Sequence, residues 1–252
     1  AALLLADYNE WLNSIYPDDM EYAARSLASV HELGSVEQRE YRIIRGDGEV
    51  RWLSDKCFVS PSKLFGGQSL IVGIAEDITE KKALQSELHR LATRDVLTGA
   101  SNRRHFFECA EVLFAEARSS GSPLSFLLLD IDDFKKINDG HGHQVGDRVL
   151  QRVAHCGAYV LRRDDLFGRI GGEEFAALFP NCDAEQARQV AERLQREVQR
   201  LQFANDGESF GVTISQGITM LGEGDVLDDL YARADAAMYQ AKRQGKDCIV
   251  LG

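Results

Sequence analysis

The sequence predicts an α+β fold, and three patterns support this. Near the N-terminus, helix-like segments precede three strand-like runs that are separated by short turns. From Ser122 onwards, apolar runs of strand length alternate with longer amphipathic segments of helical period. Within that alternation two apolar runs flank Gly171-Gly172, which indicates an antiparallel hairpin whose turn needs a positive φ. A hairpin in a mixed order of strands and helices indicates a sheet covered by helices.

The composition excludes some functions. The 252 residues carry a formal net charge of -11, and an acidic chain is a poor candidate for binding a nucleic-acid polymer. No apolar run approaches the roughly 20 residues that span a bilayer, and no signal peptide is visible. The five cysteines lack metal-ligand spacing, which is typical of thiols in a reducing compartment. We expect a cytoplasmic protein; the start Ala-Ala-Leu-Leu-Leu, without methionine, suggests a fragment whose upstream part could hold an anchor.

Residues 1–79 predict a small α+β sensor module. Helical character runs from Trp11 to Ser29, with a stop and restart at Tyr16-Pro17-Asp18-Asp19. Three strand-like runs follow, at residues 40–45, 50–54 and 69–76. Because Gly46-Asp47-Gly48 separates the first two, we expect an antiparallel meander.

A helix is predicted to begin near Thr79, which can act as its N-cap, and to continue to about residue 93. Leu84, Leu88 and Leu91 follow at spacings of four and three, so they lie on one face. This stripe of three leucines fits either an ordinary packing face or the seam of a short parallel coiled coil between two chains.

The remaining elements follow in order. The run from Pro123 to Ile131 is continuously apolar, which predicts a strand buried on both faces. Further helices are expected at residues 145–161, 184–201 and 226–244, and further strands around the hairpin and at residues 210–220 and 248–251.

Three acidic residues predict a metal site. Glu173 and Glu174 directly follow the Gly-Gly turn, and adjacent carboxylates are costly to hold together unless a cation neutralises them. Asp130 emerges at the end of the buried strand. Taken alone, Asp130 fits a helix cap better than a ligand; together with the two glutamates it favours a shared Mg²⁺.

Five motifs in register carry a family resemblance: Asp95-Val96-Leu97-Thr98-Gly99-Ala100-Ser101-Asn102-Arg103-Arg104, Leu129-Asp130-Ile131-Asp132-Asp133-Phe134-Lys135-Lys136-Ile137-Asn138-Asp139, Gly142-His143, Gly146-Asp147 and Gly171-Gly172-Glu173-Glu174-Phe175. Over about 160 residues they resemble the GGDEF family of diguanylate cyclases. The resemblance implies a palm-like, ferredoxin-type sheet similar to that of class III nucleotide cyclases.

The resemblance also implies an activity, the condensation of two GTP into cyclic di-GMP and two pyrophosphates. Each chain of a homodimer would hold one GTP. Asp130, the carbonyl of Ile131, Glu173 and Glu174 would bind Mg²⁺, or Mn²⁺ in its place, and Glu173 would also be the general base. In such a reaction a 3′-hydroxyl attacks an α-phosphate in line, and metal ions stabilise the attacking and the leaving oxygens.

Further positions match the family's substrate contacts. Asn138 and Asp147 match positions that read guanine, although a helix cap and a first-turn acid are the alternative roles. His143 is expected near the substrate, and Lys135, Lys242 and Lys246 match phosphate-binding positions. This chain departs from the family at Lys246, where arginine is usual and offers a bidentate fork, and at Ala100, where leucine is usual, so that packing near the guanine is expected to be looser.

Arg162 and Asp165 resemble the family's RxxD site for inhibition by product, and Arg193 would add a second arginine. The alternative is a charged loop before a strand. Arginine suits this role because it stacks on guanine and pairs with phosphate.

Residues 1–79 resemble the later half of a PAS domain, with its first two strands apparently missing. The matching pieces are Ile15-Tyr16-Pro17-Asp18-Asp19, Tyr41-Arg42 to Trp52, and Gly73 to Glu80. No flavin-reactive cysteine motif is present, a packing role is favoured over haem ligation for His31, and the PAS ligand is unknown. The predicted domains are a sensor at 1–79, a signalling helix at 80–93 and a cyclase domain at 94–252.

The preferred hypothesis is a product-inhibited diguanylate cyclase whose PAS portion changes the pose of the helix at 80–93. Two rivals stay open. One is a module that binds GTP or cyclic di-GMP without turnover. The other is a ligand-gated dimerisation module with the cyclase domain as passenger.

Overall fold

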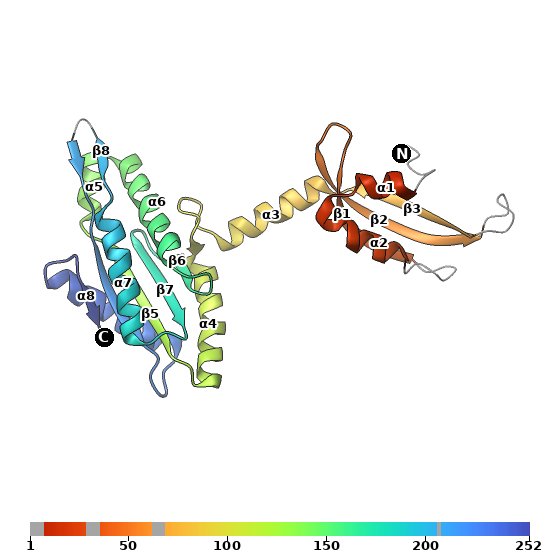
Figure 1. Cartoon of the computed structure of the whole chain (residues 1–252). Helices are drawn as coiled ribbons and strands as arrows, with labels where there is room; N and C mark the ends of the chain where they lie inside the picture. The colour runs from red at the N-terminus through yellow and green to blue at the C-terminus, as the bar shows by residue number, and fades with distance from the viewer. Residues whose placement is uncertain (1–7, 29–35, 62–68, 206–207) are drawn as a thin grey trace. The chain divides into compact units, whose positions relative to one another are not determined.

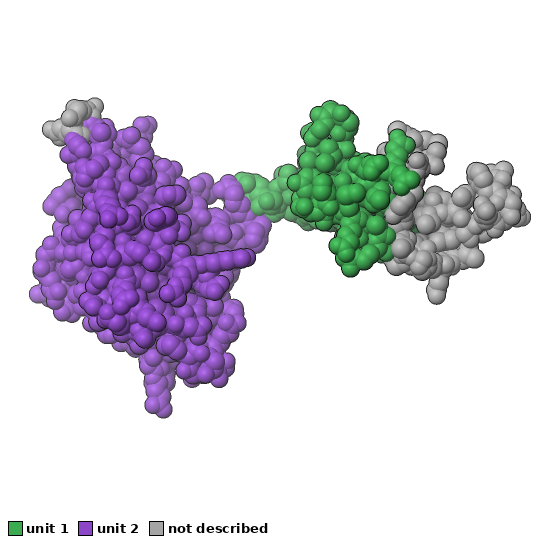
Figure 2. All heavy atoms as spheres, in the orientation of Figure 1, with its two compact units in different colours: residues 1–88 green, residues 89–252 purple. Residues whose placement is uncertain are grey.

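The computed structural model describes residues 8–28, 36–61, 69–205 and 208–252. The chain forms two compact units, residues 1–88 and 89–252 (Figures 1 and 2), and their boundary falls inside the predicted signalling helix. The domain limits at 79/80 and 93/94 stay predictions. In the described part of the chain, no helix has both the length and the apolar character that crossing a membrane requires.

The N-terminal unit contains the expected antiparallel meander, in the order β1-β2-β3 (Figure 1). Ile44 pairs with Val50 across the predicted turn. The helical segment is interrupted where predicted, because Pro17 opens a short 3₁₀ turn between two helices. His31 and Ser29 lie outside the described residues. The elements are α1 (Tyr8–Ser14), η1 (Pro17–Asp19), α2 (Met20–Ala28), β1 (Val36–Ile44), β2 (Val50–Pro61) and β3 (Ser69–Asp77).

Helix α3 (Thr79–Thr93) begins at Thr79, which is therefore not its N-cap as the sequence suggested. The N–H of Thr79 donates to Asp77 Oδ1, whereas the Thr79 hydroxyl accepts from the N–H of Trp52. No residue of α3 is buried, and Leu84, Leu88 and Leu91 are 58%, 65% and 47% exposed. The stripe therefore does not pack within the described chain, and its role as a coiled-coil seam stays a prediction.

The second unit, residues 89–252, is built on a six-stranded mixed sheet in the order β11-β10-β5-β7-β6-β4. The outer pairs β10–β11 and β4–β6 are parallel, and the inner pairs are antiparallel. This confirms the predicted α+β class. The strands are β4 (Ser101–Asn102), β5 (Leu124–Ile131), β6 (Leu166–Arg169), β7 (Glu174–Pro180), β10 (Ile214–Met220) and β11 (Ile249–Leu251); the helices are α4 (Arg103–Ser120), α5 (Phe134–His141), α6 (His143–Val160), α7 (Ala184–Gln199) and α8 (Leu227–Arg243).

Strand β5 is buried along its whole length, as predicted from its continuous apolar run. Leu127 and Leu129 lie in a cluster with apolar residues of α5, α6 and α7, whereas Phe126 and Leu128 lie in a second cluster with residues of α4 and α8. Since neighbouring residues of a strand point to opposite faces, β5 anchors helices on both sides of the sheet.

Two expectations about the strands were wrong. Neither Gly171 nor Gly172 has a positive φ. A Cβ at Gly171 would lie 2.3 Å from Glu174 Oε2, so a larger residue there would displace the end of the Glu174 side chain. The strand expected from Phe210 begins at Ile214, because Phe210 pairs with Phe203 in a separate hairpin of β8 (Phe203–Asn205) and β9 (Glu208–Phe210).

Candidate functional site

The predicted acids meet where β5 ends beside the hairpin. Asp130 stands directly opposite Glu174 in the antiparallel pair of β5 and β7. The N–H of Ile131 donates to the carbonyl of Glu173 at 3.3 Å. Asp130 does not cap the following helix, since the residue before α5 is Asp133. The capping alternative is therefore excluded, and the sheet register brings the acids to one end of the sheet.

Lys242 of α8 neutralises Asp130. Its Nζ lies 2.7 Å from Asp130 Oδ2, and the carboxylate side chain is only 7% exposed. Burial raises the pKa of Asp130 to about 6, Lys242 opposes this rise, and the charges of Glu173 and Glu174 add to it. This carboxyl group is therefore held in a crowded acidic region where additional positive charge is favourable.

A second lysine–acid pair lies beside the first. Lys246 Nζ is 2.8 Å from Asp133 Oδ2, and Lys136 contacts the other oxygen of the same carboxylate at 2.8 Å. Hydrogen bonds from these two lysines lower the pKa of Asp133 to about 2. Lys135 is an exposed residue of the same helix, α5. Lys136, Lys242 and Lys246 thus pair with Asp130 and Asp133 around the end of β5.

The predicted guanine-reading residues lie on consecutive helices. Asn138 belongs to α5, and Asp147 lies in the second turn of α6, so neither has the capping or first-turn role that was the alternative. Gly146 allows the approach of these helices, because a Cβ there would lie 1.9 Å from Asn138 Oδ1. The amide of Asn138 is therefore held beside the residue that precedes Asp147. His143 is the exposed first residue of α6.

Sequence reasoning missed two residues that hold the site. Arg169 donates to both oxygens of Asp95 and, through Nε and Nη2, to the carbonyl of Gly172, which ties the hairpin tip to the loop before α4. Asp132 accepts from Thr213, from Ser215 and from the N–H of Asp247. Arg169 lies two residues before the quoted hairpin motif, but its partner Asp95 is 74 residues away in sequence, so no local pattern signals the contact.

The donor set fits a hard divalent cation. Asp130 and Glu174 occupy facing positions from which their carboxylate oxygens could bind such a cation, together with the backbone carbonyl of Ile131. Among the described residues, no three His, Cys, Asp or Glu side chains are already grouped closely enough to hold a metal ion. Lys242 instead supplies the positive charge at Asp130.

The Arg162–Asp165 segment forms a tight turn before β6. The N–H of Arg162 donates to Asp165 Oδ2 at 2.7 Å, and burial raises the pKa of Asp165. Arg193 of α7 donates to the carbonyl of Val160, two residues before Arg162. The three predicted product-binding residues thus lie on neighbouring elements of one unit.

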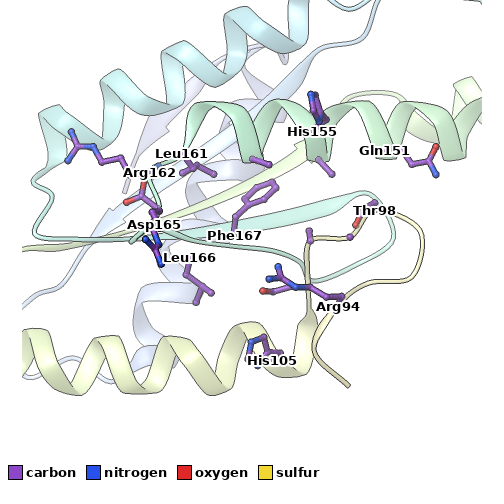
Figure 3. A pocket seen from close by; sticks show the side chains of 16 residues that line it. Arg94, Thr98, His105, Gln151, His155, Leu161, Arg162, Asp165, Leu166 and Phe167 are labelled. Carbon is purple, nitrogen blue, oxygen red and sulfur yellow. Dashed lines mark hydrogen bonds between the residues drawn. The ribbon is translucent and has the colours of Figure 1, made fainter. Parts of the chain in front are cut away.

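A cavity of about 510 Å³ borders this turn, between α4, α6 and the loop from Arg94 to Ser101 (Figure 3). In this view the Arg162 side chain points away from the cavity, whereas the side chains of Arg94 and His105 point into it. Ala100 lines the same cavity. The space left by this small side chain therefore opens beside the Arg162–Asp165 turn.

Comparisons with known proteins agree with this architecture. Residues 92–248 match the model of the family described as "Diguanylate cyclase, GGDEF domain", and residues 1–75 match the "PAS fold". The chain is 32% identical over 245 residues to a diguanylate cyclase of Vibrio cholerae, which covers 96% of this chain and 74% of that protein. It is 43% identical over 163 residues to the response regulator PleD of Caulobacter vibrioides, which covers 64% of this chain but only 36% of PleD.

Solved structures give the same result. The GGDEF domain of DgcB from Caulobacter crescentus, in complex with cyclic di-GMP, is similar with a TM-score of 0.62 and 34% identity, over 64% of this chain and 95% of that one. The active GGEEF domain of a diguanylate cyclase from Vibrio cholerae is similar with a TM-score of 0.57 and 35% identity, over 60% and 96%. With a matching family model, a matching sheet and the acidic hairpin beside Asp130, the chain belongs to the GGDEF family of diguanylate cyclases and carries a PAS fold before its GGDEF domain.

Proposed function

We propose that the chain condenses two GTP into cyclic di-GMP and two pyrophosphates, with Mg²⁺, as a homodimer. The observation that carries this is the pairing of Asp130 with Glu174 in register, next to Glu173 and with Lys242 of α8 bound to Asp130. The domains would be a sensor at 1–79, a signalling helix at 80–93 and the cyclase domain from residue 94.

Each residue has a role in this reaction. Asp130, Glu173, Glu174 and the carbonyl of Ile131 would hold the metal, which when bound would stabilise the attacking and leaving oxygens. Glu173 accepts the proton of the attacking 3′-hydroxyl. Asp147 accepts from guanine N1–H and the 2-amino group, and Asn138 donates to the guanine edge, so adenine leaves these groups unpaired. His143 lies beside the nucleotide.

Substrate binding exchanges partners within the site. In the structure Lys242 and Lys246 pair with Asp130 and Asp133. When the triphosphate enters, Lys135, Lys242 and Lys246 turn to its oxygens and Asp130 is freed. The exchange keeps charges balanced at each stage, which limits the desolvation cost of this acidic region.

One chain supplies half of the reaction centre, because each GTP must meet the 3′-hydroxyl of the other. The exposed leucines of α3 support a parallel contact between two chains, through which the PAS fold sets the alignment of the half-sites. In a Leu84→Gln/Leu88→Gln variant we expect low activity that recovers as protein concentration rises. Activity unchanged at low concentration contradicts this role.

Arg162, Asp165 and Arg193 form the product-inhibition site. Their placement on neighbouring elements, with Arg193 of α7 bonded just before the turn that carries Arg162 and Asp165, supports this. The cyclic di-GMP complex of the similar DgcB domain supports it as well. In Arg162→Ala we expect added cyclic di-GMP to inhibit product formation less than in the wild type. Arg152 is an exposed arginine on α6, and the control variant Arg152→Ala should keep full inhibition. Equal inhibition of both variants contradicts the assignment.

The central test is incubation of the full chain with GTP and Mg²⁺, followed by chromatography of the products. We expect cyclic di-GMP from the wild type, and a loss of roughly 10²–10⁴-fold in Glu173→Ala, as for removal of a general base. Glu223→Ala, on an exposed loop, is the matched control and should be fully active. Nucleotide binding without product at high protein concentration would instead support a non-catalytic binding module.

A further inference from the structure

The loop that carries Lys246 has an unusual backbone. After α8 ends, Gly245, Lys246 and Asp247 have φ values of +116°, +65° and +47°. Glycine adopts such values freely, but residues with a Cβ are disfavoured there. Two consecutive residues of this kind persist only where surrounding contacts hold them.

Contacts from α7 hold this loop. Gln195 Nε2 donates to the carbonyl of Asp247 at 2.6 Å and to its Oδ1 at 2.9 Å. Gln199 Nε2 donates to Oδ1 at 2.9 Å and to Oδ2 at 2.8 Å. We call Asp247 with these two glutamines the Asp247 clasp. Gln195 and Gln199 are one helical turn apart, so both face the loop.

The helix behind the clasp is itself fixed. One turn before Gln195, the carbonyl of Ala191 accepts from the buried Gln216 of β10 at 3.1 Å. Leu194 and Val198 are buried in the core on the same helix. On the other side of the loop, the N–H of Asp247 donates to Asp132. The loop is therefore clamped between a rigid helix and a buried carboxylate.

The geometry points to a role for Gln195 and Gln199 in substrate binding. We infer that they are positioning residues, which act through Asp247 to hold the ammonium group of Lys246 at the end of β5, where the phosphates of GTP would lie. This inference rests on the proposed function. A lysine has a flexible stem and binds phosphate as a point charge, so its backbone must be placed accurately if it is to replace a bidentate arginine.

The clasp predicts a specific kinetic change. In the full-length Gln195→Ala/Gln199→Ala variant, we expect the KM for GTP to rise about tenfold, as for the loss of hydrogen bonds to a charged group, with a much smaller change in kcat. Alanine is a good helix former, so α7 is retained. Gln189→Ala is the matched control, because Gln189 on the same helix donates to Glu185 at the exposed surface and not to the loop.

A double-mutant cycle separates positioning from general structure. The two alanine substitutions should add little to the KM of a Lys246→Ala variant, because the group that they position is already missing. Gln199→Glu, which places a carboxylate against Asp247, should raise KM, and Gln199→Lys should restore it. An unchanged KM in the double alanine variant, or an effect that adds fully to that of Lys246→Ala, overturns the inference.

Hydrogen exchange tests the clasp without turnover. The amide of Asp247 should exchange faster in Gln195→Ala/Gln199→Ala than in the wild type or in Gln189→Ala. If the wild type makes no cyclic di-GMP, the proposed function fails, and the exchange rates still decide whether the clasp holds the loop. Equal rates in all three proteins would reject the clasp itself.

Discussion

Each unit of this chain buries one carboxylate against a basic side chain, but the two pairs are built differently. In the N-terminal unit Asp55 pairs with Arg39 at 2.6 Å, and their side chains are 9% and 3% exposed. In the GGDEF unit Asp130 pairs with Lys242 at 2.7 Å, with side chains 7% and 33% exposed. The first cation is enclosed, whereas the second reaches solvent.

The Arg39 pair is a closed network. Arg39 bonds Asp55 through two nitrogens, the carbonyl of Ala23 through a third, and Cys57 Sγ, and it lies over the ring of Trp11. Tyr41 donates to the same carboxylate. All three nitrogens of the planar guanidinium donate at the same time. Removing Arg39 or Asp55 would therefore leave the other buried charge without a counter-ion.

The Asp130 pair is open by comparison. Lys242 is a point charge on a flexible stem, and the pKa of Asp130 stays raised despite its presence. The comparison indicates that the Arg39 network stabilises a core, whereas the partly solvated Lys242 can be replaced at Asp130 by another cation.

The largest expected effect on stability lies in the closed network. Arg39→Met should lower the unfolding free energy of the N-terminal unit by about 3–5 kcal/mol, since it leaves the buried charge of Asp55 without a cation. Tryptophan fluorescence in urea reports this unit alone, because both tryptophans of the chain, Trp11 and Trp52, lie in it. Arg25→Met, at an exposed pair, should change little. Equal stability of the two variants would show that the network is not enclosed.

The open pair should govern activity more than stability. Asp130→Asn should reduce cyclic di-GMP formation about 10²–10³-fold, because it removes a charged ligand from the reaction centre. Its unfolding free energy should not fall, since burial disfavours the ionised carboxyl that is removed. Product chromatography and urea unfolding followed by circular dichroism measure both, with the exposed Asp139→Asn as control. Full activity of Asp130→Asn contradicts its role as a ligand.

Removing the cation of the open pair should cost less than removing Arg39. We expect Lys242→Met to lower the unfolding free energy of the GGDEF unit by about 1 kcal/mol, because its ammonium is partly solvated. Added Mg²⁺ should restore the loss by supplying the missing charge. A loss as large as that in Arg39→Met would remove the distinction between the two pairs.

A third pair provides the smallest effect. Asp19 accepts from the guanidinium and from the N–H of Arg42, and this hydrogen bonding lowers the pKa of Asp19 below its usual 3.8. The contribution to stability is therefore complete above pH 3.8 and is lost as the pH falls through the lowered pKa. Tryptophan fluorescence of wild type and Asp19→Asn should converge in stability only at acid pH. A constant difference between them down to the lowest pH would reject the link.

The sequence predicted those features that depend on residues close together in the chain better than those that depend on distant residues. The burial of β5, the meander and the acidic hairpin were predicted, because they depend on residues that are close in sequence. The positive φ expected at the Gly171-Gly172 turn was wrong, and Gly171 instead leaves room for the side chain of Glu174. The residue roles in the site stay predictions, although the structure gathers those around Asp130.

By itself, the sequence determined the class of fold, the buried strand, the hairpin and the family motifs, since periodicity and turn residues are local properties. It did not reveal the helix α4 or the short hairpin of β8 and β9. Tertiary structure alone decided which basic or amide side chain meets which acidic residue. Lys242 reaches Asp130, Arg169 reaches Asp95, and Gln195 reaches Asp247 across 112, 74 and 52 residues. Such contacts depend on sheet register and helix packing, which no local pattern encodes.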